Sequence, residues 1–330
     1  MDPICKPERD LLQEWSDGFV DRDKKFVEEF QTTFNSSFWE LYLYATFNEY
    51  GFNVDWSHQA PDFAIIGEGV EFIVEAVTAN AADGKPNEWD RTFSEKELKI
   101  LGDLKKLNTE AIIRLSNAIL GKVRKYNESY KNLDHVKNMP FVIAAAPFEQ
   151  PHFNHQYDRP IRALLYNYYV DEEAYLLSPE KFPDGPPGIQ LDYVEKDNGA
   201  EIPLGFFNDP GMEEVSAIVF SCTATWGKLS ALSVNEMRDT KVVSTWATPP
   251  NGEPEKRECS AEEHEESITD GLQVFHNPYA KYPLDSKVFR REGVVQLYFD
   301  IDKNEWIYEG VTGALLVRQV FSIDKNKRGR

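Results

Sequence analysis

Apolar and polar residues alternate with different periods along the first half of the chain, and these periods predict an order of elements. Positions 37–50 carry apolar residues at helical spacing and are followed by Gly51, as expected of a helix that ends at a glycine. Two β-branched and aromatic runs, 63–66 and 70–77, flank a Gly-Glu-Gly turn and predict a hairpin. The continuous apolar run 141–146 predicts a strand that is buried on both faces.

The rest of the chain adds helices around this stretch and a mixed C-terminal half. Further helices are predicted at 8–15, 21–30, 96–107, 109–130 and 161–169, strands at 216–221, 294–299 and 305–308, and a solvated acidic loop at 249–270. We therefore expect an α/β protein with a mixed central sheet flanked by helices and an α+β C-terminal extension. The expected division is an N-terminal helical segment 1–33, a core 34–147, and a region 148–330 that recognises a substrate or a partner.

The carboxylate of Glu75 lies in the middle of the second strand of the predicted hairpin, between apolar residues. Side chains alternate between the two faces of a strand, so Glu75 shares its face with Ile73 and Val77. A buried charge in such a strand is costly unless it is paired or coordinates a metal ion. Asp62 follows Pro61 at the start of the first strand, thirteen residues earlier. The spacing predicts that the two carboxylates converge.

These residues resemble the PD-(D/E)XK superfamily, the restriction-endonuclease-like nucleases. The signature of that family is Pro-Asp, a spacer of about this size, and Glu-x-Lys on the next strand, and the resemblance covers residues 34–147. It implies a restriction-endonuclease-like core in which Asp62, Glu75 and the carbonyl of Ala76 bind Mg²⁺ or Mn²⁺, with Glu40 as the acid of the preceding helix. Position 77 departs from the signature, because Val77 stands where the family has lysine.

A lysine from the following helix is the candidate for the missing ammonium group. The apolar stripe of the predicted helix 109–130 runs through Leu115, Ala118 and Ile119, and Lys122 takes its next position. Lys122 therefore points toward the sheet, where its charge could polarise water and stabilise a reacting phosphate. The alternative is a lysine whose stem covers apolar surface while its head stays in water. Arg114 is the second candidate.

The proposed ligands also have ordinary structural explanations. Pro-Asp opens many turns, because proline fixes its backbone angle and aspartate bonds its own main chain, so Asp62 alone indicates little. Ser37 and Glu40 have the spacing of a capping box, in which the glutamate bonds back to the N-cap amide. Glu75 is the hardest of these acids to explain as a surface or turn residue.

The charge distribution leaves one region suited to a nucleic acid. The net charge is −20, which disfavours binding of phosphates by the surface as a whole. Between Lys96 and Lys137, however, basic residues outnumber acidic ones by ten to five. Arg114, Lys122 and Lys125 belong to this segment and are the expected contacts to DNA. An ordinary solvated helix would have the same composition.

The cysteines and the lengths of the apolar runs argue against several other classes of protein. Cys5, Cys222 and Cys259 are far apart and odd in number, which predicts free thiols and argues against a disulfide framework or a zinc knuckle. Apolar runs stay well below the length of a membrane span, and the N-terminus lacks the basic and then apolar layout of a signal peptide. We expect a cytoplasmic protein with no membrane partner.

The resemblance implies a Mg²⁺- or Mn²⁺-dependent nuclease that hydrolyses phosphodiesters in DNA rather than RNA. By analogy it would act in a bacterial defence or mobile-element system, with a protein partner or as a homo-oligomer. The alternative is a catalytically inactive protein of the same fold that serves as a scaffold, which Val77 and the net acidity favour. Another type of nucleotide enzyme is ranked last, because the sequence contains no Gly-rich phosphate loop.

Overall fold

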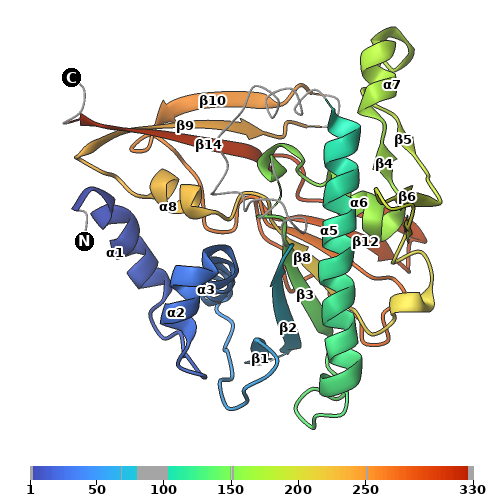
Figure 1. Ribbon diagram of the computed structural model, residues 1–330, viewed down its shortest axis with the longest axis horizontal. Helices are drawn as coiled ribbons and strands as arrows, with labels where there is room; N and C mark the ends of the chain where they lie inside the picture. Colours follow the sequence, from blue (N-terminus) through green and yellow to red (C-terminus); the bar gives the residue numbers. More distant parts are fainter. Residues whose placement is uncertain are drawn as a thin grey trace. The chain divides into compact units, whose positions relative to one another are not determined.

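The protein has a mixed α/β fold built on a seven-stranded sheet with parallel and antiparallel pairs (Figure 1). A computed structural model describes residues 3–67, 69–79, 103–148, 150, 152–249 and 252–325. The order of the strands in this sheet is β1-β2-β3-β8-β11-β12-β13. The predicted α/β class is therefore confirmed. No helix among these residues is both long and apolar enough to cross a membrane.

Two compact units make up the chain, and each consists of segments that are not consecutive. Unit 1 comprises residues 1–72, 223–274 and 285–330, and unit 2 comprises residues 73–222 and 275–284. This division differs from the three consecutive regions expected from the sequence, since residues 34–147 are shared between the units. Strands β2 (Val70–Thr78) and β11 (Gln273–His276) each continue from one unit into the other.

Unit 1 begins with helices that surround an aromatic core. Its other elements are η1 (Pro3–Cys5), α1 (Lys6–Trp15), α2 (Phe26–Thr32), α3 (Phe34–Glu49), β1 (Phe63–Gly67), α8 (Trp226–Leu232), β9 (Arg238–Trp246), β10 (Glu255–Ser260), β12 (Val295–Asp300), β13 (Glu305–Glu309) and β14 (Leu315–Asp324). Phe47 of α3 makes edge-to-face contacts with Phe63 and Phe72. Aromatic pairs of this kind add stability beyond the area that they bury. Buried Glu8 ties α1 to Arg238 at 3.1 Å.

A second sheet in unit 1 corrects the expectation for residues 249–270. Strands β9, β10 and β14 form it in the order β10-β9-β14, with antiparallel pairing on both sides of β9 (Figure 1). The predicted acidic loop was wrong for residues 255–260, which form β10. Charged side chains suit this strand because it lies at the edge of the three-stranded order, where charges discourage pairing with other chains.

Unit 2 is built on parallel strands covered by a long helix. Its elements are the second part of β2, α5 (Leu104–Lys125), η3 (Tyr126–Tyr130), β3 (Phe141–Ala146), η4 (Phe153–His155), α6 (Arg159–Tyr166), β4 (Tyr169–Val170), α7 (Glu172–Leu177), η5 (Pro179–Lys181), β5 (Gly188–Ile189), β6 (Tyr193–Glu195), β7 (Glu201–Pro203), η6 (Pro210–Met212) and β8 (Ala217–Phe220). β3 pairs in parallel with β2 on one side and β8 on the other. All six residues of β3 are buried, as its apolar run predicted.

The helix α5 corrects the two helices predicted at 96–107 and 109–130. It runs unbroken from Leu104 to Lys125 and continues into the π-helical turn η3 (Figure 1). Residues 80–102, which include most of the first predicted helix, lie outside the described part of the chain. Asn108, where the break was expected, is buried inside the helix and accepts a 3.0 Å hydrogen bond from Gln156. The polar side chain is thus satisfied by a tertiary partner, which a local pattern cannot reveal.

Candidate functional site

Glu75 is a fully buried carboxylate on a strand that is hydrogen-bonded within the sheet. Its side chain has no exposed surface, and its neighbours Val74 and Ala76 are buried as well. In the parallel register with β3, Glu75 lies opposite Ile143. The sequence placed Glu75 in such an apolar strand, and the structure confirms its burial. A carboxylate in this position needs a compensating positive charge.

Two lysines from the last turn of α5 supply that charge. Lys122 Nζ donates to Glu75 Oε2 at 2.7 Å, and its side chain is 20% exposed. Lys125 Nζ lies 3.3 Å from Oε1 and 3.2 Å from Oε2 of the same carboxylate. The inward orientation expected for Lys122 is confirmed by this contact. Lys125 reaches the site from a more exposed position and also lies 5.0 Å from the ring of Tyr130.

Arg114 and Ala76 lie on the same two elements. Arg114 is half-buried on α5, about two turns before Lys122. Ala76 pairs with Ala144 of β3 in the ladder next to Glu75. Their expected roles, contact with DNA for Arg114 and a carbonyl ligand for Ala76, stay predictions.

Asp62 is held at the start of β1 by an arginine from the loop before α2. Arg22 donates to the carbonyl oxygens of His58, Pro61 and Asp62, at 2.5, 3.0 and 2.8 Å. Its guanidinium also lies 5.5 Å from the ring centre of Trp56. Five donors in a rigid fork allow one arginine to fix several carbonyls at once. Arg22 therefore sets the path of the backbone that presents the Asp62 side chain.

Glu40 is an interior residue of α3, so its interpretation as part of a capping box was wrong. The helix begins at Phe34 after the N-cap Thr33, and no side chain caps it. Ser37 is a buried residue of the first turn rather than the N-cap. The ring of Phe34, the first residue of the helix, stacks on that of Phe38 at 5.5 Å. Glu40 is thus too far along the helix to cap its start, and it lines a pocket.

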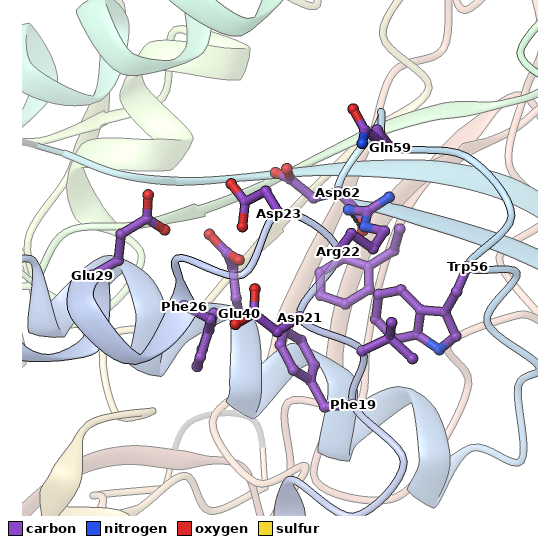
Figure 2. Close-up of a pocket in the computed structure, with 12 residues that line it drawn as sticks. Phe19, Asp21, Arg22, Asp23, Phe26, Glu29, Glu40, Trp56, Gln59 and Asp62 are labelled. Carbon is purple, nitrogen blue, oxygen red and sulfur yellow. Dashed lines mark hydrogen bonds between the residues drawn. The ribbon is translucent and has the colours of Figure 1, made fainter.

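Glu40 and Asp62 line the same pocket in unit 1, which has a volume of about 250 Å³. Figure 2 shows the carboxylates of Asp23, Glu40 and Asp62 pointing toward the same part of the pocket. Asp21 and Glu29 add two further acids to its lining, which also contains Arg22, Gln59 and the aromatic side chains Phe19, Phe26, Trp56 and Phe63. The excess of carboxylates makes the pocket attractive to cations.

The chemistry of this lining fits a hydrated divalent cation. Mg²⁺ takes oxygen ligands, commonly one or two carboxylates, and keeps several waters. Asp21 Oδ1 is a buried oxygen that lacks a hydrogen-bond partner in the described structure, and it belongs to the pocket lining. Within the described residues, however, no three His, Cys, Asp or Glu side chains are arranged to hold a metal ion directly. The pocket thus suits an ion bound partly through water.

The two motif carboxylates belong to different units. Asp62 is part of unit 1, and Glu75 is part of unit 2. Their convergence stays a prediction. Each is therefore described by its own surroundings, an acidic pocket for Asp62 and a pair of lysines for Glu75.

Sequence reasoning missed four charged residues of the pocket lining. Asp21, Arg22, Asp23 and Glu29 come from the segment between α1 and α3, which was interpreted only as acidic helix. The available signal was the cluster Asp21-Arg22-Asp23 shortly after Gly18, because a glycine and a group of short acidic residues favour a loop over a helix. The predicted helix 21–30 was wrong for residues 21–25, since α2 begins at Phe26. Comparison with known proteins adds no further residue: no family model, curated protein or solved structure matches this chain.

Proposed function

We propose that the chain is a metal-dependent phosphodiesterase of the restriction-endonuclease-like type that acts on DNA. The observation that carries the proposal is the ion pair between Lys122 and the buried Glu75, at 2.7 Å. It brings an ammonium from α5 to the carboxylate of the motif, where the signature would use a lysine at position 77. A side chain from another element thus meets the same electrostatic requirement.

The order of the elements supports this proposal. Helix α3 is followed by the hairpin strands β1 and β2, then by helix α5 and by β3, which pairs in parallel with β2. This is the order of helix, hairpin, helix and buried strand that the family resemblance implies. Because fold alone does not define activity, the proposal depends on the side chains that this order presents.

Each group has a role that follows from its chemistry. A divalent cation would supply Lewis acidity toward a phosphate oxygen and a water of lowered pKa. Asp62 and Glu40 would hold it in the acidic pocket, and Glu75 would fix the Lys122 ammonium in place. Lys122 would stabilise negative charge as it develops on the phosphate. The basic last turn of α5, with Arg124 and Lys125, offers contacts for the DNA backbone.

A catalytically inactive scaffold of the same fold is the second candidate, and one observation favours it. Both oxygens of Glu75 already have lysine partners, through Lys122 and Lys125. A buried carboxylate whose two oxygens both have lysine partners can help to specify the fold without taking part in a reaction. Under this alternative the chain would bind a protein partner or a second copy of itself.

Cleavage of labelled DNA in Mg²⁺ or Mn²⁺ separates the two candidates. The proposal expects cleavage by the wild type and a loss of about 100-fold or more in Asp62→Asn and in Glu75→Gln. Glu71→Gln is the matched control, because Glu71 is an exposed residue of the strand that also carries Glu75. Calorimetry with Mn²⁺ should show weaker binding for Asp62→Asn and Glu40→Gln than for Glu28→Gln, an exposed acid outside the pocket. A folded wild type that binds no metal and cuts no DNA supports the scaffold.

A further inference from the structure

Cys259 lies on the inner side of the three-stranded sheet of unit 1. In the antiparallel register of β10 and β9 it is opposite Val242, and Val242 is fully buried. Val320 of β14 pairs with the same valine from the other side. Cys259 itself is partly exposed, because β10 is the edge strand of the three. The thiol is therefore placed against a packed surface and still open to small molecules.

A histidine from the segment after β10 faces this thiol. His264 Nδ1 lies 3.8 Å from Cys259 Sγ, a distance suited to a hydrogen bond that involves sulfur. The opposite ring nitrogen, Nε2, lies 2.8 Å from Glu266 Oε2. The imidazole therefore links the thiol to a carboxylate, and its side chain is only 2% exposed.

The state of Glu266 determines which nitrogen of His264 carries the proton. Glu266 is fully buried, and its Oε1 atom is bound by Lys228 at 2.6 Å and by Arg318 at 2.5 Å. Burial opposes ionisation, but the charges of Arg318 and Lys228 outweigh it and hold the pKa of Glu266 well below its usual range. An ionised carboxylate only accepts, so His264 Nε2 must donate to it. In the tautomer that carries its proton on Nε2, Nδ1 has a free lone pair and can accept the proton of Cys259.

Here the geometry points to a second reactive centre, in which Cys259 is the nucleophile, His264 the general base and Glu266 the group that orients the base. A nucleophile, a base within hydrogen-bond reach and a third group that fixes the base are the parts required for covalent catalysis. We propose that this centre accepts a small acyl group from an activated ester or a thioester. Nothing in the nuclease proposal uses these three residues.

The acyl transfer step balances within these groups and the substrate. Cys259 Sγ attacks the carbonyl carbon while its proton passes to His264 Nδ1. The new S–C bond forms as the bond to the leaving oxygen or sulfur breaks, and that atom departs with the electron pair and takes up a proton from His264 or from solvent. Burial raises the pKa of the Cys259 thiol, so the resting group is protonated and depends on the base during attack.

The other two cysteines serve as internal controls. Cys222 is buried in unit 2. Cys5 is partly exposed like Cys259, but its sulfur lies 3.0 Å from an Arg238 nitrogen, a donor that cannot remove a proton. If solvent exposure alone controlled the reaction, a reagent would label Cys5 and Cys259 alike. If a base assists the reaction, the reagent labels Cys259 first.

The experiment treats the full chain with p-nitrophenyl acetate, and mass spectrometry locates the acetyl group. We expect acetylation of Cys259 ahead of Cys5, a burst of p-nitrophenol that disappears in Cys259→Ser, and a loss of about 100-fold in the acetylation rate in His264→Gln. ¹⁵N NMR of the wild type should show the proton of His264 on Nε2, a readout that does not depend on the folding of any variant. Equal labelling of Cys5 and Cys259, an unchanged rate in folded His264→Gln, or a proton on Nδ1 would each overturn the proposal.

Discussion

Lys122 on α5 and Glu75 on β2 form a 2.7 Å ion pair in which the carboxylate is wholly buried and the ammonium is mostly buried. The two residues are 47 positions apart in sequence, so the pair fixes the last turn of the helix against the strand. Removing one partner of such a pair strongly destabilises the folded protein, because the other charge is left buried without a partner. The pair therefore has consequences for stability that are independent of any activity.

Lys122→Met should lower the free energy of unfolding by about 2 to 3 kcal/mol, somewhat less than for a pair with no other partner, because Lys125 stays close to Glu75. Lys125→Met is the matched control. Its side chain is 46% exposed, so its loss should cost less than about 1 kcal/mol. Urea denaturation of the two variants measures the difference. Equal free energies of unfolding for the two variants would show that the buried pair with Lys122 contributes no more to stability than the exposed contact of Lys125.

The same pair suggests a double variant. Glu75→Gln with Lys122→Met removes both charges, so its cost should be smaller than the sum of the two single changes. Additive costs would mean that the residues do not interact in solution.

Glu266 gives unit 1 a defined dependence on pH. Its folded pKa lies below its usual value of 4.5, so its contribution to stability is fully present above about pH 4.5. That contribution is lost as the pH falls through the folded value. Glu266→Gln should therefore destabilise the protein by about 3 to 5 kcal/mol at pH 7, because Lys228 and Arg318 lose their partner.

Below pH 4.5 the difference between Glu266→Gln and the wild type should shrink, which denaturation at a series of pH values would measure. Glu265→Gln is the control, since Glu265 is the exposed neighbour. A difference that stays constant into strong acid would contradict the assigned protonation of Glu266.

Arg22 is expected to order the loop that presents Asp62. Arg22→Ala removes the donor to three carbonyl oxygens and should lower the free energy of unfolding by about 1 to 3 kcal/mol. Hydrogen exchange of residues 58–63 should become faster in the variant. Lys24→Ala, at an exposed position in the same loop, should leave both quantities unchanged. Normal protection of residues 58–63 in Arg22→Ala would show that the loop is held by other contacts.

The sequence predicted those parts of the fold whose local signal agrees with their tertiary surroundings. The two apolar runs expected to form a hairpin are strands β1 and β2, which are neighbours in the sheet, and the apolar run of β3 is buried along its whole length. The inward position of Lys122 also followed from the period of α5. In each case the side chains that decide the structure lie within one element.

The predictions from sequence were wrong where contacts between residues distant in sequence determine the local structure. The polar Asn108 suggested the end of a helix, but Gln156 binds it and the helix continues. Ser37 and Glu40 suggested a helix start, but the helix begins three residues earlier, at Phe34, whose ring contacts those of Phe30 and Phe38. The charged strand β10 was interpreted as a loop, because its partner β9 pairs with it through backbone hydrogen bonds that no pattern displays.

The central claim is that the ammonium of Lys122 replaces the lysine that the nuclease signature has at position 77. The most direct test moves that charge back, by combining Lys122→Met with Val77→Lys and measuring Mg²⁺-dependent DNA cleavage. The account predicts that Lys122→Met alone loses about 100-fold of the cleavage rate and that adding Val77→Lys restores at least a tenth of the wild-type rate. Full cleavage by Lys122→Met, or no restoration in a double variant that melts like the wild type, would contradict it.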